Sequence, residues 1–188
     1  MAVAQPKPKY TVDDLWEISH RTGKRYELVR GELRELTPTG WEHGRISARV
    51  ARLLDTYAST TRRGIVLGAE AGCVLRKGDA VTVRAPDAAF VALERLEEGR
   101  VPERFGEVVP DLVVEVVSPG DTYAEIAEKV NDWLNAGVRL VWVVDPRDRR
   151  VSVHKPGEPV RILGEGDTLC GEEVLPGFEC AISELFAL

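Results

Sequence analysis

The most distinctive chemistry in this sequence is one carboxylate inside an otherwise apolar run. Glu115 lies in DLVVEVVSP, residues 111–119, among valines and a leucine. An ionised carboxylate taken out of water costs several kcal/mol unless a cation or hydrogen-bond donors compensate it. A magnesium ion held by one or two carboxylates, a backbone oxygen and waters would supply that charge. A metal site at Glu115 would therefore need a second carboxylate beside it.

Two Pro-Asp pairs offer a second acid, Pro86-Asp87 and Pro110-Asp111. Asp111 precedes Glu115 on the same strand by roughly 13 Å, at about 3.3 Å per residue, which is too far to share one ion. Asp87 opens the strand-like segment PDAAFVAL, and pairing of that segment could place it next to Glu115. A purely structural role stays open for both Asp87 and Glu115. Pro-Asp also opens ordinary turns, and a strand-end glutamate can reach solvent or pair with an arginine.

The elements around Glu115 predict an α/β fold. Residues 111–118 favour a strand buried on both faces, because they are almost continuously apolar. Residues 124–137 favour an amphipathic helix with Gly137 as its C-cap, and residues 138–146 favour a second apolar strand. Strand, helix and strand in this order are typical of a parallel crossover. The charged turn DPRDRR then leads into VSVHKP, an antiparallel return strand.

The rest of the chain completes one domain over residues 10–188, preceded by a short disordered lead, residues 1–9. Thr11 and Asp14 predict the start of a helix over 11–21, which Gly23 closes. The tail from residue 161 favours one or two short strands and a closing helical turn. Between these ends the pattern predicts a hairpin over 26–36, an amphipathic helix from 41 to about 60, and three segments of strand character, IVLGAEAG, CVLRKG and VTVRAPDAAFVAL.

In the order of these motifs, the chain resembles the PD-(D/E)XK nuclease superfamily, and within it the Uma-type family of proposed restriction endonucleases. The matching features are YELVRGEL, a helix carrying His43, APDAAFV, PDLVVEVVSPGD, a helix carrying Lys129, and AGVRLVWVVDP. The resemblance implies a restriction-endonuclease-like fold with a mixed central β-sheet flanked by helices. It also implies Asp87 and Glu115 as ligands of Mg²⁺, with Mn²⁺ as an alternative, and the Val116 carbonyl as a further ligand.

The lysine departs from the superfamily pattern, which implies a lysine two residues after the acid. Val117 stands there and cannot orient a water. The resemblance to the Uma-type family implies that the lysine lies on the following helix instead, and Lys129 fits that position. It falls about 40° from Trp133, at the edge of the apolar face, so its long side chain can lie along the core and reach the strand end. The alternative is an ordinary i,i+4 pair with Glu125.

These residues together imply metal-assisted hydrolysis of a DNA phosphodiester bond. Lys129 would position the attacking water or stabilise the charge of the transition state. The resemblance also places Glu27 and His43 near the site, Glu27 as an outer metal ligand and His43 in contact with phosphate or shuttling a proton. Glu27 facing a hairpin neighbour, and His43 as a partly buried polar residue, are the alternatives.

The amino-acid composition limits the kinds of partner that the protein can bind. The net charge is −6, from 25 basic and 31 acidic residues. This disfavours a protein that coats nucleic acid non-specifically, but a bound cation would offset the acids of a nuclease site. The chain has no run of 18 apolar residues, so we expect no membrane partner. Cys73, Cys170 and Cys180 lack CxxC spacing and predict buried or half-buried residues of a cytoplasmic protein, with neither a disulfide framework nor a zinc site.

Two functional hypotheses follow, an Mg²⁺-dependent DNA endonuclease and a catalytically degenerate nuclease-fold module that acts in binding or assembly. The acidic charge and the displaced lysine keep the second one open. A homodimer is compatible with either, and an exposed apolar strand residue such as Trp142 would serve it. We interpret Trp16, Trp41, Trp133 and Trp142 as core or interface residues rather than base-stacking platforms, because no basic cluster is interleaved with them.

Overall fold

A computed structural model describes residues 10–77 and 80–188, so the predicted N-terminal lead lies outside the described residues. Two 3₁₀ turns, η1 (Leu93–Arg95) and η2 (Glu97–Gly99), occupy the charged segment before residue 110. The helices and strands are α1 (Val12–Thr22), β1 (Tyr26–Val29), β2 (Glu32–Glu35), α2 (Trp41–Thr61), β3 (Gly64–Gly68), β4 (Cys73–Lys77), β5 (Ala80–Arg84), β6 (Ala88–Ala92), β7 (Leu112–Val116), α3 (Tyr123–Ala136), β8 (Leu140–Asp145), β9 (Arg150–His154), β10 (Arg161–Leu163), β11 (Thr168–Cys170), β12 (Glu179–Ala181) and α4 (Ile182–Phe186).

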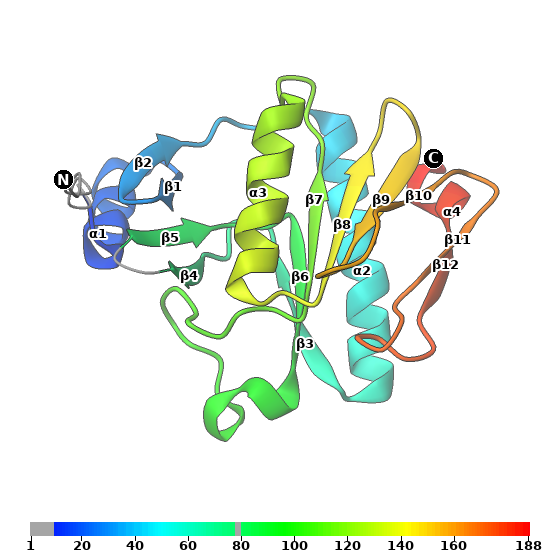
Figure 1. The fold of residues 1–188 in the computed structure, drawn as a ribbon. Helices are drawn as coiled ribbons and strands as arrows, with labels where there is room; N and C mark the ends of the chain where they lie inside the picture. Colours follow the sequence, from blue (N-terminus) through cyan, green and yellow to red (C-terminus); the bar gives the residue numbers. More distant parts are fainter. Residues whose placement is uncertain (1–9, 78–79) are drawn as a thin grey trace.

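The strands of the described residues form a large mixed sheet, a smaller antiparallel sheet and a two-stranded ribbon (Figure 1). The six-stranded sheet has the order β10-β9-β8-β7-β6-β3, and the four-stranded sheet has the order β2-β1-β5-β4. In the large sheet β7 and β8 are parallel and joined through α3, while β8 and β9 are antiparallel. The predicted crossover, the return strand and the mixed central sheet are therefore confirmed.

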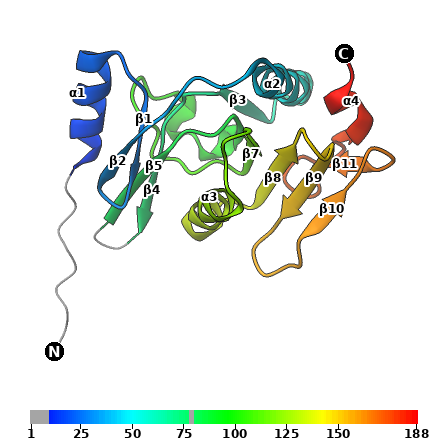
Figure 2. The ribbon, with the colours of Figure 1, turned by 90° about the horizontal axis from the view of Figure 1, so that it is seen from above.

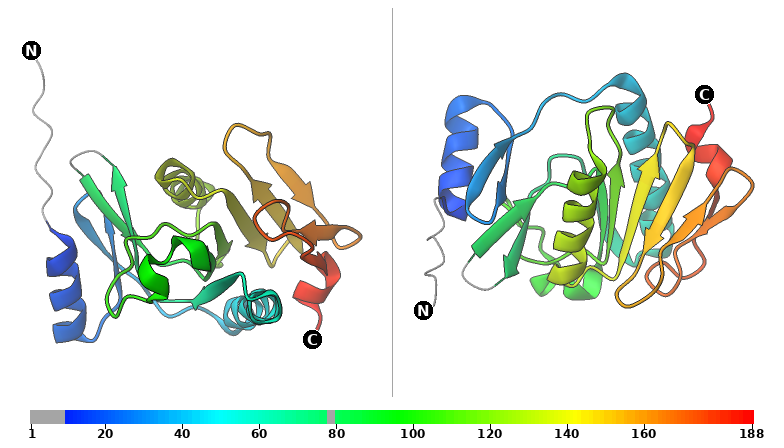
Figure 3. Two further views of the ribbon diagram at one scale, coloured as in Figure 1. Left: turned by 90° about the horizontal axis from the view of Figure 1, so that it is seen from below. Right: turned by 45° about the horizontal axis from the view of Figure 1, so that its top comes forward.

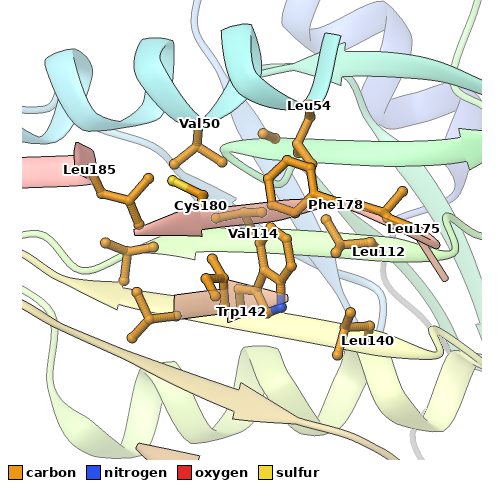
Figure 4. Close-up of a cluster of buried hydrophobic side chains, with 14 of the residues drawn as sticks. Val50, Leu54, Leu112, Val114, Leu140, Trp142, Leu175, Phe178, Cys180 and Leu185 are labelled. Carbon is orange, nitrogen blue, oxygen red and sulfur yellow. The ribbon is translucent and has the colours of Figure 1, made fainter. Parts of the chain in front are cut away.

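Helices cover both faces of the large sheet, α2 on one side and α3 on the other (Figure 2). Alternation along β7 divides its side chains between them. Val114 packs with Val50 and Leu54 of α2 in a core that also contains Trp142 and the C-terminal segment (Figure 4). Val113 packs in a second cluster on the α3 side. Glu115, two residues after Val113, therefore belongs to the α3 side.

The small sheet, covered by α1, lies beside the large sheet and is seen at the left of the right-hand view in Figure 3. Leu15 of α1 packs with Leu28 and Val83 of the small sheet. The helix begins with a capping box, in which Thr11 and Asp14 bond each other's backbone N–H groups, and ends at Gly23 in a left-handed conformation (φ 67°). Both ends of α1 are as predicted. Within the described residues, no helix combines the length and apolarity that a bilayer crossing requires.

One strand prediction is wrong. VTVRAPDAAFVAL was expected to be one segment, but β5 belongs to the small sheet and β6 to the large sheet. Pro86 stands between them, and a proline has no N–H to donate to a ladder. The segment therefore passes from one sheet to the other at Pro86, immediately before Asp87.

Some predictions about tryptophan and cysteine are also wrong. Trp142 is 1% exposed, so it cannot be a surface contact of a homodimer. Its ring is enclosed between the sheet and Phe178, at a centroid distance of 5.6 Å. Trp41 is 97% exposed, which excludes the core alternative for it and leaves the interface alternative untested. Cys170 is exposed rather than buried, while Cys73 and Cys180 are buried as predicted, and all three are free thiols.

Candidate active site

Strand register brings Asp87 to Glu115. β6 and β7 are antiparallel with Ala88 opposite Val114, so Asp87, the residue before β6, lies at the end of β7 that carries Glu115. The Asp87 N–H donates to the Val114 carbonyl over 3.1 Å. Its Oδ2 in turn accepts a hydrogen bond of 2.7 Å from the Val116 N–H. These two bonds fix the Asp87 carboxylate at the end of β7.

Two donors from α3 compensate the buried Glu115 carboxylate. Its side chain is 2% exposed. Lys129 Nζ lies 3.1 Å from Oε2, and the Trp133 indole N–H donates to Oε1 over 2.7 Å. Lys129 and Trp133 are four residues apart and therefore lie on the same face of α3. Lys129 extends along the apolar face as predicted and contacts Glu115 rather than serving only a surface pair with Glu125.

The charges around Glu115 are unbalanced. Burial raises the pKa of Glu115, the Lys129 charge lowers it, and the charges of Asp87 and Glu27 raise it again, so the net shift is upward. The Glu115 charge raises the pKa of Lys129 against the effect of burial, and Glu27 and Asp87 add to this rise. Lys129 lies against Glu115, while Arg84 pairs with Glu27 and His43 with Asp87. An additional cation between Asp87 and Glu115 would lower the pKa of Glu115.

His43 joins Asp87 from the opposite helix. It lies in the first turn of α2, is 6% exposed, and its Nε2 is 3.3 Å from Asp87 Oδ2. Burial lowers the pKa of His43, but hydrogen bonding to the Asp87 carboxylate and the Val116 carbonyl outweighs it, and the net shift is upward. The imidazole therefore faces the side chain and the backbone oxygen that were predicted as metal ligands.

Glu27 is anchored by a residue that the sequence analysis did not single out. Arg84 Nη1 lies 2.7 Å from Glu27 Oε2, and the Ala85 N–H donates to Glu27 Oε1 over 3.0 Å. Arg84 is 2% exposed and its other nitrogens contact Asp132 of α3, the shorter distance being 2.6 Å. Glu27 thus holds the Ala85 backbone just before Pro86-Asp87 with Oε1, and the Arg84 side chain with Oε2. Its role as an outer metal ligand stays a prediction.

All the predicted site residues line one cleft of about 470 Å³. The cleft lies at the end of the molecule where α2 and α3 begin, and the loops 36–40 and 118–121 complete its wall (Figure 1). The residues that meet here come from five separate parts of the chain. They are Glu27 of β1, His43 of α2, Asp87 before β6, Glu115 and Val116 of β7, and Lys129 of α3.

The donor set fits a hard divalent cation. Asp87, Glu115 and the Val116 carbonyl supply only oxygen ligands, which Mg²⁺ prefers. No group of three or more histidine, cysteine or acidic side chains arranged to hold a metal occurs in the described residues. Mg²⁺ does not require one, because it is usually bound by one or two carboxylates together with waters. The buried Glu115 carboxylate, at the same strand end as Asp87, is the feature of this structure that favours such a cation.

Comparison with known proteins shows the family of this chain. The model of the Uma2 family, described as "Putative restriction endonuclease", matches residues 12–183. The chain belongs to the Uma2 family. No curated protein matches it significantly.

A solved structure with the same fold is described as a "putative nuclease belonging to DUF820" from Anabaena variabilis ATCC 29413. It superposes with a TM-score of 0.79 at 19% sequence identity, over 94% of this chain and 97% of that chain. At this identity the likeness shows the fold alone. The Uma2 match and this structure confirm the predicted family and the predicted nuclease-like fold.

Proposed function

We propose that this Uma2-family chain is a metal-dependent endonuclease that hydrolyses DNA phosphodiester bonds. The observation that carries the proposal is the buried contact between Glu115 and Lys129 beside Asp87, inside a cleft. Asp87, Glu115 and the Val116 carbonyl would hold Mg²⁺ or Mn²⁺. When bound, such a cation polarises a phosphoryl oxygen and lowers the pKa of a coordinated water.

The chain's own residues then have distinct roles. Lys129 presents an ammonium at the cleft, where it would stabilise the negative charge that develops on the transferred phosphoryl group. His43, whose raised pKa favours its charged form, would donate a proton or bind a phosphate oxygen. Arg84 and Glu27 hold the backbone before Asp87 and thereby keep that carboxylate in place.

A plasmid-nicking assay in Mg²⁺ tests the proposal. Asp87→Asn, Glu115→Gln and Lys129→Met are expected to lower the nicking rate by about 100-fold or more, the usual effect of losing a group that stabilises a transition state. Glu158→Gln is the matched control, because Glu158 is an exposed acid paired with Lys155. It should cut as fast as the parent protein. Equal nicking by all five proteins would trace the activity to a contaminant and remove the proposal.

The second candidate is a degenerate nuclease-fold module that acts in binding or assembly. It is favoured by one observation, that both Glu115 oxygens already accept bonds from Lys129 and Trp133. A carboxylate satisfied in this way has no need of a metal ion. Calorimetric titration with Mg²⁺ separates the candidates. The endonuclease should release or absorb heat that Asp87→Asn abolishes, whereas the module should show no binding and should lose no stability in Glu115→Gln.

A further inference from the structure

Two aromatic side chains are almost fully exposed. Trp41 is 97% exposed and Tyr123 is 90% exposed, which makes them the most exposed large apolar side chains of the described residues after the C-terminal Leu188. Single exposed apolar residues are common on protein surfaces and need no explanation by themselves. Two large exposed aromatic rings near the same cleft are less common and suggest a shared binding role.

Both residues lie at the rim of the candidate active site. Trp41 is the first residue of α2, directly after the cleft wall 36–40, and Tyr123 opens α3, two residues after the wall 118–121. The two helices begin at the same end of the molecule, on opposite faces of the large sheet (Figures 1 and 2). Neither ring lines the cleft itself, but a strand that leaves the cleft over the start of either helix would meet an exposed aromatic ring.

We propose that the cleft binds an unpaired nucleic-acid strand whose bases stack on Trp41 and Tyr123. This inference rests on the proposed nuclease function and narrows its substrate to single-stranded or locally unpaired nucleic acid. An exposed aromatic ring offers a flat face on which any base can stack, but a base exposes its own face only when it is unpaired. The earlier interpretation of Trp41 as a core or interface residue thus gives way to a base-stacking role.

The charges of the cleft favour a single strand over a duplex. Its wall contains Glu35, Glu70 and Glu125, and the chain as a whole has a net charge of −6. A duplex carries one negative charge per roughly 1.7 Å of its axis, so this wall would repel it more strongly than one strand. Arg25 and Arg34 also line the cleft and remain 39% and 43% exposed.

The size of the cleft and the donors on its wall agree with this. A guanidinium has five N–H donors, so Arg25 and Arg34 can bind a phosphate while each keeps its carboxylate partner. A volume of about 470 Å³ lies in the range of pockets that hold a small organic ligand. Such a pocket fits one or two nucleotides of a single strand rather than a paired helix.

Fluorescence anisotropy with a fluorescein-labelled, mixed-sequence DNA 12-mer tests the inference in EDTA, where no hydrolysis occurs. Trp41→Ala and Tyr123→Ala are each expected to raise the Kd for the single strand by about 5- to 100-fold, the usual effect of losing one stacked base. Trp41→Phe and Tyr123→Phe should restore most of the affinity. Ile162→Ala is the control, since Ile162 is 65% exposed on β10 and outside the cleft. Its Kd should stay within twofold of the parent value.

Two further readouts make the test specific. The parent protein should bind the 12-mer duplex at least tenfold more weakly than the single strand. A 2-aminopurine base in the strand should lose fluorescence when it binds, through stacking, and this quenching should disappear in Trp41→Ala with Tyr123→Ala. A change that only disturbed folding would not restore quenching in the phenylalanine variants.

Several results would overturn the inference. They are no measurable binding of the strand, equal affinity for strand and duplex, or an unchanged Kd in the double alanine variant. Sedimentation velocity tests the alternative that Trp41 and Tyr123 form a protein–protein interface. If the parent protein self-associates and the double variant is a monomer with unchanged strand affinity, the rim is a protein interface and the inference is wrong. Because EDTA removes catalysis from the measurement, failure to cleave a single-stranded DNA in Mg²⁺ would count against the proposed function and leave the binding result standing.

Discussion

Glu115 shows how a buried charge is distributed among unlike partners. Lys129 supplies a full positive charge to one oxygen and Trp133 a neutral N–H to the other. This compensation is incomplete, because the net shift raises the pKa of Glu115 to about 7, with burial as the largest cause. A carboxyl group in this state is poised to gain a cation, since a nearby positive charge would lower its pKa again.

The raised pKa of Glu115 predicts a dependence of stability on pH in EDTA. Between pH 4.5 and about 7 the unfolded chain has lost the Glu115 proton while the folded protein still holds it. The free energy of unfolding should therefore fall as the pH rises through this window, by roughly 3 kcal/mol at most. Glu115→Gln cannot titrate and should lack this part of the fall.

Urea denaturation of both proteins at pH 5 and pH 8 measures the difference. His43 also titrates in this range, with a raised pKa, and its contribution cancels when the parent protein is compared with the variant. Parallel stability curves for the two proteins would contradict a raised pKa at Glu115.

Some of these residue contacts could be predicted from the sequence and others could not. The position of Asp87 at the Glu115 end of β7 follows from strand order, because Asp87 comes directly before a strand that runs antiparallel to β7. Trp133 was recognisable as a neighbour of Lys129 on the same helix face, but its role as a donor depends on side-chain direction. Arg84 carried no such signal. It alternates with valines on β5, and only the approach of α3 shows that it is buried with Glu27 and Asp132.

At the scale of elements, α3 connects the two sheets. Its N-terminal half reaches Glu115 on the large sheet through Lys129, and Glu128 and Asp132 face the arginines of the small sheet. Hydrogen bonding to Arg34 is the main cause that lowers the pKa of Glu128 to about 2. Local pattern predicts α3, its C-cap Gly137 and its apolar face. The split of β5 from β6 at Pro86 escaped prediction because the strand period continues across the proline while the sheet changes.

The Arg84 contacts predict a large coupling between α3 and the small sheet. Arg84→Met should lower the free energy of unfolding by about 3–5 kcal/mol, because it leaves the buried Glu27 carboxylate without its counter-charge. Adding Glu27→Gln to Arg84→Met should recover part of this loss, since no charge then remains stranded. Urea denaturation of the four proteins in this cycle gives the coupling energy.

Arg149→Met is the matched control for Arg84→Met. Arg149 pairs with Glu165 at the surface, and both side chains are nearly half exposed, 45% and 46%. A pair of this kind contributes at most about 1 kcal/mol. A loss in Arg84→Met no larger than in Arg149→Met would mean that Arg84 does not fasten α3 to the small sheet.

At the scale of the whole molecule, the protein is acidic, and only a few basic side chains face its proposed substrate. Three cationic side chains line the cleft in reach of solvent, namely Arg25, Arg34 and Lys129. For a single strand, the logarithm of the binding constant falls with the logarithm of salt concentration by about 0.7 for each phosphate neutralised. Three contacts therefore predict a slope of about −2, much shallower than that of a protein that coats nucleic acid.

This salt titration should distinguish the phosphate contacts from the base-stacking contacts of the proposed interface. Arg34→Gln removes a phosphate contact, so it should reduce the magnitude of the slope by about 0.7. Trp41→Ala removes a stacked base and no charge, so it should weaken binding at every salt concentration and leave the slope unchanged. The anisotropy assay with the DNA 12-mer, repeated from low to moderate salt, measures both quantities. A slope that Trp41→Ala alters and Arg34→Gln does not would mean that the phosphates and bases lie elsewhere than this cleft and its rim.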